Sequence, residues 1–430
     1  MEKAYEGTMQ ASITDFLHKC KISITVKIDT ALASLQTAAP VVERLAVFMR
    51  GGKMIRGALV RLGAQLCGNS AVPDEVLDWA GAAMEFFQAG LLIHDDIMDR
   101  DAVRRGMPTV YWQYAEDAKQ YLKDRVRSAD RDQESALSDN KSKQSNPMQD
   151  VVHYGEAQGI SAGDIAFFLG YYSLERCITA LVSHKIAEQR DGACAAVTAG
   201  TADSLAFTAL ELCKVGLAQM LDVQYGTDFF NSDPSITDIL EVYRYKTGRY
   251  TFSLPLSLGA RLAGADLSVC NMLEDYGEQL GIIFQLKDDE LGIFAPPEKL
   301  GKVSGADIRE NKKTIHRKML FDVPELPGYI KALFGKKDIT DRDIQKVQDA
   351  MEHYHVTDRV QELMRTYIEQ AKHIRENLQI LCAHAIEKLS VETNESKTAL
   401  DKHRGGAQYE YTDSFIFLAQ LERYSLEREF

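Results

Sequence analysis

Long stretches of the sequence carry apolar side chains at the spacing of one helical face, and this pattern restricts the fold more than any other feature. It runs from Ser12 to about Trp112 and returns over residues 164–180, 201–225, 236–262 and 270–294. Apolar residues that recur three or four positions apart cover one face of an α-helix. Alternating, strand-like runs are scarce, and the chain has only 10 prolines. We therefore predict an all-α protein.

Two strongly polar segments interrupt the helical pattern, at about residues 114–149 and 391–409. We expect both to be exposed insertions. The first should be mobile, because it lacks the apolar surface needed to offset the entropy lost on ordering. No repeat and no linker divides the remaining sequence. We therefore expect a single helical domain over residues 1–430.

The net charge of −13 argues against nucleic acid or an anionic membrane surface as a partner, because both need a positive field. The seven cysteines are scattered, without the paired spacing of metal ligands. The beginning of the chain lacks the charged and then apolar pattern of a secretion signal, and no apolar run reaches the length of a membrane span. We expect a cytoplasmic protein that binds any anionic ligand through a local basic cluster.

The most informative motif is an acidic triplet at the end of an apolar helical run, LLIHDDIMD. Asp95 and Asp99 are one helical turn apart on the same face, and Asp96 lies beside them. Like charges at this spacing destabilise a helix, and a bound cation would compensate them. Carboxylate oxygens suit Mg²⁺, which keeps positions open for phosphate oxygens. An isolated triplet of this kind is more often a solvated helix end.

A second acidic pair, Asp288 and Asp289, ends another apolar run in FQLKDDELGIF. Alone it resembles ordinary surface sequence, because Lys287 and Glu290 flank it. The presence of two such motifs, each at the end of a buried helix, makes it less favourable to interpret the acids as ordinary solvated surface residues. Facing each other, they can hold a metal cluster.

Basic residues stand near both acidic motifs, where phosphate groups would need them. Arginine offers a planar fork for phosphate and lysine a point charge. Each basic residue alone is more often a surface residue, but arginines that abut three aspartates suit an anion bound together with its metal. The residues are Lys53, Arg56, Arg104, Arg105, Lys246, Lys302 and Lys312.

Five motifs in this order resemble the motif series of the trans-prenyl diphosphate synthases, the farnesyl and geranylgeranyl diphosphate synthase family. They are GGKMIRG, DDIMD with RRGMPT, KTGRYTF, FQLKDD and GKVSGADIRENKK. The resemblance covers about Val42 to Lys313, and the ending LERYSLEREF is similar to the family's C-terminal segment. It implies antiparallel helices around a central catalytic cavity, in a homodimer.

The resemblance also implies the reaction. Such an enzyme joins isopentenyl diphosphate to an allylic diphosphate, namely dimethylallyl, geranyl or farnesyl diphosphate, and makes a longer linear all-trans product. It uses Mg²⁺, about three ions in each site, held through carboxylates and substrate phosphates.

Carried over residue by residue, the resemblance assigns three kinds of role. The metal ligands are Asp95, Asp99 and Asp288, supported by Asp96 and Asp289. Arg104, Lys246 and Lys302 would bind the allylic diphosphate. Isopentenyl diphosphate would be bound by Lys53, Arg56, Gln88 and Arg105. Lys312 would be a further substrate contact. Thr247 and Gln285 lie near the reacting allylic carbon.

The second acidic motif departs from the commonest form of the family. Gly292 stands where many members have a third aspartate. A glycine there also occurs in the family, accompanied by a downstream segment like GADIREN, in which Asp307 would supply charge from the outer shell. The third ligand of this motif is left open.

Product length depends on the residues beneath the first motif. Members of the family that stop at fifteen carbons have bulky aromatics one turn before it, where this chain has Gly90 and Leu91. One helical turn is about 5.4 Å, close to one extended isoprene unit. With Phe86 and Phe87 closing the next turn, we expect mainly a twenty-carbon product, geranylgeranyl diphosphate, with longer chains as the next alternative and farnesyl diphosphate as a further one. The alternative is that these phenylalanines are ordinary interhelical core.

Two other functions stay open at this stage. A class I terpene cyclase would use the first motif to ionise one diphosphate, but it has no need of GGKMIRG for a second. A catalytically silent subunit that regulates an active relative would be expected to lose one acidic motif, and this sequence keeps both.

Overall fold

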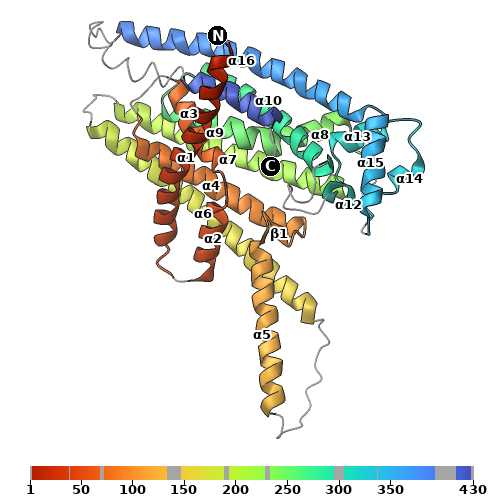
Figure 1. Ribbon diagram of the computed structural model, residues 1–430. Coiled ribbons are helices and arrows are strands. Elements are labelled where there is room, and N and C mark those ends of the chain that lie inside the picture. The colour runs from red at the N-terminus through yellow and green to blue at the C-terminus, as the bar shows by residue number, and fades with distance from the viewer. Residues whose placement is uncertain are drawn as a thin grey trace. The chain divides into compact units, whose positions relative to one another are not determined.

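The computed structural model describes residues 2–37, 39–67, 72–132, 147–187, 193–227, 233–294, 305–336, 338–392 and 413–427. Helices account for most of them (Figure 1). Within these ranges the only strands are β1 (Val103–Arg104) and β2 (Met107–Pro108), which form one antiparallel pair. The predicted all-α class is confirmed.

The contacts group the chain into two compact units, each described by itself here. Unit 1 comprises Met1–Ile24, Met54–Gly81 and Leu174–Phe430, and unit 2 comprises Thr25–Lys53 and Ala82–Ser173. Helices α1 (Glu2–Ala33), α4 (Asp74–Met98) and α6 (Pro147–Ala187) contribute residues to both units. The prediction of a single domain stays a prediction.

Unit 1 also holds the remaining helices of the C-terminal half and α3. They are α3 (Ile55–Leu66), α7 (Ala193–Gly226), α8 (Ile236–Val242), the π-helix η2 (Tyr243–Ser253), α9 (Leu254–Leu262), α10 (Leu267–Phe294), α12 (Ala306–Arg309), α13 (Ile315–Phe321), α14 (Gly328–Lys331), α15 (Asp341–His353), α16 (Val356–Glu392) and a last helix over residues 413–427. Unit 2 adds α2 (Pro40–Arg50), the β1–β2 hairpin and α5 (Val110–Asp132).

Helix α10 is the centre of unit 1. It packs against η2, α9 and α16, and its residues Leu273, Leu280 and Ile283 are completely buried. The hydroxyl of the buried Tyr276 donates to the carbonyl oxygen of Leu418 at 2.9 Å, which ties the last helix to this core. The apolar face that the sequence predicted for residues 270–294 therefore builds the core beside the second acidic motif.

The run predicted as helix over residues 236–262 begins at a capping box, in which Ser235 and Asp238 hydrogen-bond reciprocally. Its middle is not α-helical but is the eleven-residue π-helix η2. Such wide turns are rare in proteins, but where they occur they often lie at functional sites. The apolar period of the sequence does not distinguish them from ordinary α-helix.

Glycines bring η2 against α10 backbone to backbone. A Cβ atom added to Gly281 would lie 1.9 Å from the Cα of Gly248, and one added to Gly277 would lie 2.4 Å from the Ser253 nitrogen. Real side chains cannot occupy these positions. The close approach fixes η2 on the helix that carries the second acidic motif.

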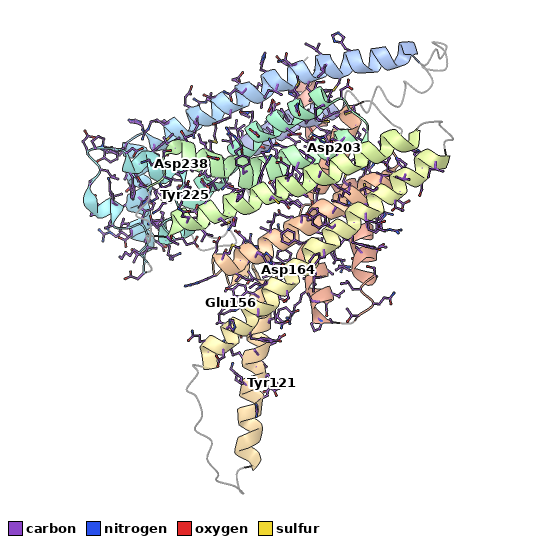
Figure 2. The ribbon with its side chains drawn as sticks, turned by 180° about the vertical axis from the view of Figure 1, so that it is seen from behind. Tyr121, Glu156, Asp164, Asp203, Tyr225 and Asp238 are labelled. Atoms are coloured by element: carbon purple, nitrogen blue, oxygen red, sulfur yellow. The ribbon has the colours of Figure 1, made fainter. Side chains whose placement is uncertain are left out.

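The first polar segment differs in part from the prediction. Residues 110–132 form helix α5, so this half has regular structure that the polar sequence did not predict, while its mobility stays a prediction. Local contacts explain the helix: Lys119 pairs with Glu116 at 2.9 Å, and Gln120 donates to Asp124 at 3.0 Å. The predicted exposure is seen, as at Tyr121 (Figure 2), which is 66% exposed. Residues 133–146, and 393–412 around the second insertion, lie outside the described residues.

Three helical segments, Asp74–Met98, Met148–Ala187 and Asp203–Gly226, are long and apolar enough to be candidate membrane spans by length and composition. The prediction that no apolar run reaches this length is therefore wrong. That prediction looked for unbroken apolar runs, whereas these helices intersperse apolar with small and polar residues. The apolar stretch of the first segment is 83% buried within the protein, but that of the third only 28%.

Candidate active site

The first acidic motif stands in the last turn of α4. The Asp99 amide donates to the carbonyl oxygen of Asp95 at 2.8 Å, so these two residues remain in helical register. The helix then stops at Arg100, which has a positive φ of 58°, while the Asp101 amide reaches back to the Asp96 carbonyl at 2.8 Å. This bond pattern is a Schellman-type end. It presents Asp95 and Asp99 on one face, as the sequence predicted.

The middle acid of the motif, Asp96, points into unit 2 and is completely buried. Its Oδ1 accepts from the Arg104 Nε at 2.6 Å, and a second Arg104 nitrogen lies 3.5 Å from Asp95. Burial raises the pKa of Asp96 to about 6, although the Arg104 charge opposes the shift. The other oxygen, Oδ2, is buried and accepts no hydrogen bond within the described residues. Asp96 therefore supports the motif from behind, and Arg104 links it to Asp95.

A two-residue turn places the next basic residue. Arg105 and Gly106 both have positive φ, 53° and 73°, as in the tight turns that join twisted hairpin strands. An Arg105 guanidinium nitrogen lies 3.8 Å from the position of a Cβ on Gly51. The exposed Lys53 follows two residues later. Within unit 2, Arg105 thus lies close to the turn that carries Lys53. These two residues are predicted to bind the same diphosphate.

The second acidic motif lies in the last two turns of α10 in unit 1. Asp289 is buried, and its two oxygens accept hydrogen bonds from the Tyr243 hydroxyl and from the Gln285 Nε2, the latter at 2.9 Å. Burial, and next the Asp307 charge, raise the pKa of Asp289 above its usual range. Asp288 is half-buried on the neighbouring face. The geometry suits Asp289 as a support and leaves Asp288 as the outward carboxylate.

Helix η2 adds two predicted residues to the same cluster. The Thr247 hydroxyl donates to the Gln285 Oε1 at 2.7 Å. Lys246 Nζ lies 2.5 Å from an Asp222 carboxylate oxygen at the end of α7. Thr247, Gln285 and Asp289 therefore form one continuous hydrogen-bond series beside Asp288.

Gly292 makes room for the carboxylate of Asp307. A Cβ on Gly292 would lie only 2.6 Å from Asp307 Oδ2. Asp307 is fixed by Lys312, whose amide donates to its carbonyl at 2.9 Å and whose Nζ lies 3.6 Å from Oδ1. The carboxylate of Asp307 thus stands where a side chain at position 292 would begin.

The face of α4 below the first motif is only half-buried at Asp95, Leu91 and Gln88, which follow one another by helical turns. At the next turn Met84 is completely buried. Leu91, rather than Gly90, therefore lies directly beneath Asp95 on the partly open face. Gln88 shares this face.

Gly90 does not leave open space, and this part of the product-length argument is wrong. A Cβ there would lie 2.9 Å from the Gly163 carbonyl oxygen and from the Phe167 ring of α6. Phe87 faces the same helix, with its ring 5.1 Å from that of Tyr171 in an edge-on contact. Gly90 is small because α6 packs closely on it, and Phe87 belongs to this interhelical core. Phe86 is also completely buried.

The donor set fits a hard divalent cation. In the described ranges, no three His, Cys, Asp or Glu side chains already surround one point. Mg²⁺ usually takes one or two carboxylates and leaves its other positions to water and phosphate. In unit 2 the half-buried acids Asp95 and Asp99 offer such oxygens, with the buried Asp96 beside them, and in unit 1 the half-buried Asp288 offers another. Lys302 lies outside the described residues.

Sequence reasoning missed the residues that hold the site in place. Tyr243, Asp222 and Thr251 are respectively the partners of Asp289, Lys246 and Arg56. Each lies far from its partner along the chain, so no local motif joins the pairs. A surface pocket of about 460 Å³ between α5 and α6, which Tyr121 and Tyr154 line, contains none of the predicted site residues.

Comparison with known proteins gives a consistent assignment. A family model described as polyprenyl synthetase matches residues 41–351. The geranylgeranyl diphosphate synthase of Methanosarcina mazei is 29% identical over 75% of this chain and 78% of its own length. The geranylfarnesyl diphosphate synthase of Natronomonas pharaonis is 30% identical over 62% of this chain and 64% of its own.

A solved structure extends the similarity to nearly the whole chain. The geranylgeranyl pyrophosphate synthase of Corynebacterium glutamicum, solved in complex with isoprenyl diphosphate and magnesium, superposes with a TM-score of 0.69. The match covers 96% of this chain and 99% of that one, at 25% sequence identity. The relatives differ in the length of the product for which they are named.

Proposed function

The chain belongs to the polyprenyl synthetase family, and on that premise we propose that it condenses isopentenyl diphosphate with an allylic diphosphate. The product is a linear, all-trans prenyl diphosphate. The observation that carries this proposal is the cluster of Lys246, Thr247 and Gln285 beside Asp288. It combines a cation, two oriented dipoles and an outward carboxylate, as the ionisation of an allylic diphosphate requires.

The hydrogen-bond series orients the dipoles. Asp289 accepts from the Gln285 Nε2, so the Gln285 Oε1 must face the other way, toward the Thr247 hydroxyl. Since the Thr247 proton is donated to that oxygen, the remaining lone pairs of Thr247 are available to an adjacent cation. Fixed dipoles of this kind stabilise charge that develops in a transition state without reorganising. They suit an allylic carbocation.

The cations of the chain hold the departing diphosphate. Arg104 is positioned by Asp96 in unit 2, and Lys246 by Asp222 in unit 1. When bound, Mg²⁺ neutralises the diphosphate and makes it a better leaving group. The double bond of isopentenyl diphosphate then attacks the allylic carbon, and the released diphosphate accepts the proton that is lost. No nucleophilic side chain is required.

The proposed product is geranylgeranyl diphosphate. Two of the relatives described above are named for it, but one is named for the next longer product. The face of α4 beneath Asp95 carries the aliphatic Leu91, which leaves more room than an aromatic ring. Burial is complete from Met84 downward on that face, which limits the length of the tail.

We also propose a homodimer, supported by an apolar outer face on α7. Its exposed positions include Leu210, Cys213, Leu217 and Met220, which recur at helical spacing. Leu217 is 62% exposed and Met220 is 69% exposed. A continuous apolar stripe of this kind marks an interaction surface. Leu217→Glu should convert the dimer to a monomer in sedimentation analysis, whereas Gln224→Glu, further along the exposed side of the helix, should not.

The proposed reaction is tested by incubating the protein with radiolabelled isopentenyl diphosphate and each allylic diphosphate in turn, with Mg²⁺ or with a chelator. We expect label in an acid-labile, extractable product only when both substrates and the metal are present. Cyclic hydrocarbon formed from the allylic substrate alone would indicate a terpene cyclase. Stimulation of an active relative, without turnover of its own, would indicate a regulatory subunit.

A further inference from the structure

We propose that Thr251 is a positioning residue, which fixes the guanidinium of Arg56 for the diphosphate of isopentenyl diphosphate. The inference rests on the proposed function, because that function supplies the ligand of Arg56. It adds a residue to which no motif of the sequence pointed. It also gives the second half of η2 a role.

The contact is direct and lies wholly within unit 1. The Arg56 Nη2, in the first turn of α3, donates to the Thr251 Oγ1 at 2.6 Å. The Arg56 guanidinium carbon lies 4.8 Å from the centre of the Tyr250 ring, within the range of a cation–π contact. Two consecutive side chains of η2 therefore hold one side of the guanidinium.

This contact fixes the orientation of the Arg56 guanidinium through one of its terminal nitrogens. Thr251 is 3% exposed, and its helix is fixed against α10 at Gly248 and Gly281. Arg56 itself is half-buried. One of its terminal nitrogens is occupied by Thr251, so the fork can no longer rotate freely. Orientation made before binding reduces the entropy lost when the diphosphate binds.

The same short helix also carries Lys246 and Thr247, at its other half. Residues for the allylic substrate and the support of a residue for isopentenyl diphosphate are therefore mounted on one element. A salt bridge from Arg249 to Glu278, at 2.6 Å, further ties η2 to α10. Mounting both on a rigid element keeps the two diphosphates in constant register, so that the reacting carbons meet in a near-attack geometry.

The alternative is that Thr251 is an ordinary core residue, whose hydroxyl has a hydrogen-bond partner but no effect on substrate binding. In that case its replacement would change stability, or kcat and both KM values together. A positioning role predicts a selective effect on one substrate. Steady-state kinetics with each substrate varied in turn distinguishes the two readings.

The test substitution is Thr251→Val, which keeps the shape of the side chain and removes the hydroxyl. We expect the KM for isopentenyl diphosphate to rise about ten- to hundredfold, the loss typical of a hydrogen bond to a charged group. The KM for the allylic substrate and kcat should change less than about twofold. Thr251→Ser, which keeps the hydroxyl, should restore the wild-type KM.

Ser253 provides a matched control on the same helix. Its hydroxyl is equally buried and donates to the Glu274 carbonyl oxygen at 2.6 Å, not to Arg56. Ser253→Ala should leave the KM for isopentenyl diphosphate unchanged. If it raises that KM as much as Thr251→Val does, the effect is a general loosening of η2, and the proposal is overturned.

A double-mutant cycle tests whether Thr251 acts through Arg56. In an Arg56→Lys background, adding Thr251→Val should change the KM for isopentenyl diphosphate less than about twofold, because the partner of Thr251 has already been lost. Full additivity of the two substitutions would overturn the proposal. If the valine variant does not fold, Thr251→Ala takes its place in the cycle.

Calorimetric titration of isopentenyl diphosphate separates this proposal from the proposed function. Weaker binding by Thr251→Val than by wild type supports the positioning role even where the wild type shows no turnover, which would refute only the proposed reaction. Equal binding by both proteins, with normal turnover, would overturn the positioning role alone.

Discussion

The two acidic motifs lie near the C-terminal ends of two buried helices, but the chain supports them by different means. At the end of α4, the buried Asp96 is paired with a guanidinium, that of Arg104, eight residues further along the chain. At the end of α10, the buried Asp289 receives neutral hydrogen bonds, and its Tyr243 partner stands 46 residues earlier. The first motif carries its countercharge within its own segment. The second is completed by distant elements.

The third acid shows the same difference. The first motif contains it in sequence, as Asp99. The second has Gly292 at that position, and the carboxylate of Asp307 occupies the space instead. Glycine at position 292 thus leaves room for a carboxylate that comes from a later segment of the chain.

The largest effects are expected where the two regions are most alike. Asp95→Ala and Asp288→Ala should each lower kcat by about a thousandfold or more, because each removes a carboxylate that we propose as a ligand of the catalytic metal. Thermal unfolding should change little, since both side chains are half-buried at helix ends. Turnover assays at saturating Mg²⁺ provide the measurement. Near-normal turnover by either folded variant would remove that motif from the mechanism.

Gly292 and Asp307 sharpen the comparison. Gly292→Asp restores the acid in sequence but places its Cβ 2.6 Å from the Asp307 carboxylate, so we expect kcat/KM to fall about tenfold or more. Asp307→Ala alone should also lower it, but the double variant should recover most of the activity. Thermal shift on adding Mg²⁺ with inorganic diphosphate gives a readout that is independent of turnover. If the double variant has a lower kcat/KM than both single variants, the prediction that an aspartate at position 292 can replace Asp307 is contradicted.

Helix α4 offers a comparison of two faces. Leu91→Phe, on the face below Asp95, should shorten the main product to fifteen carbons. Phe87→Ala, on the face that contacts α6, should lower the free energy of unfolding by about 3–5 kcal/mol by creating a cavity, with the product length unchanged. Product chromatography and denaturant unfolding measure the two effects. Longer products from Phe87→Ala would instead place that ring at the floor of the tail site.

The smallest expected effect concerns pH and the second region alone. His316 follows Ile315, whose amide donates to the Tyr243 hydroxyl at 3.2 Å. Burial lowers the pKa of His316 from 6.5 to about 4, with a smaller contribution from Lys287. The unfolded chain therefore binds a proton that the folded chain excludes, and the stability present above pH 6.5 is lost as the pH falls toward 4.

The full loss from this one group is roughly 3 kcal/mol. Urea unfolding at pH 7 and pH 5 should show about 2 kcal/mol of this loss, because pH 5 is still above the folded pKa. His316→Leu should flatten the difference between the two values. An unchanged difference in the variant would show that other groups cause the acid sensitivity.

Two kinds of feature could be predicted from the sequence: the positions of the helices, and the charged motifs near helix ends. Both have physical reasons. Apolar residues at helical spacing mark a buried face wherever it packs, and the predicted run over residues 270–294 coincides with most of α10. Charged motifs at helix ends, such as Asp95 with Asp99, are local. They can be recognised without knowing what surrounds them.

What the sequence did not predict depends on contacts between distant segments. Gly90 was expected to open space, but α6 fills it. Tyr243 and Thr251 were read as part of a regular helix, whereas η2 turns them toward Asp289 and Arg56. The role of such residues is set by partners that no helical period identifies.

Chain elongation by the wild-type protein tests the central claim most directly. The protein is incubated with Mg²⁺, labelled isopentenyl diphosphate and farnesyl diphosphate, and the dephosphorylated products are separated by chromatography. The account predicts labelled, linear, twenty-carbon alcohol as the main product, and none when the metal is chelated. Absence of any labelled product longer than the allylic substrate, from folded protein with both substrates and metal present, would contradict it.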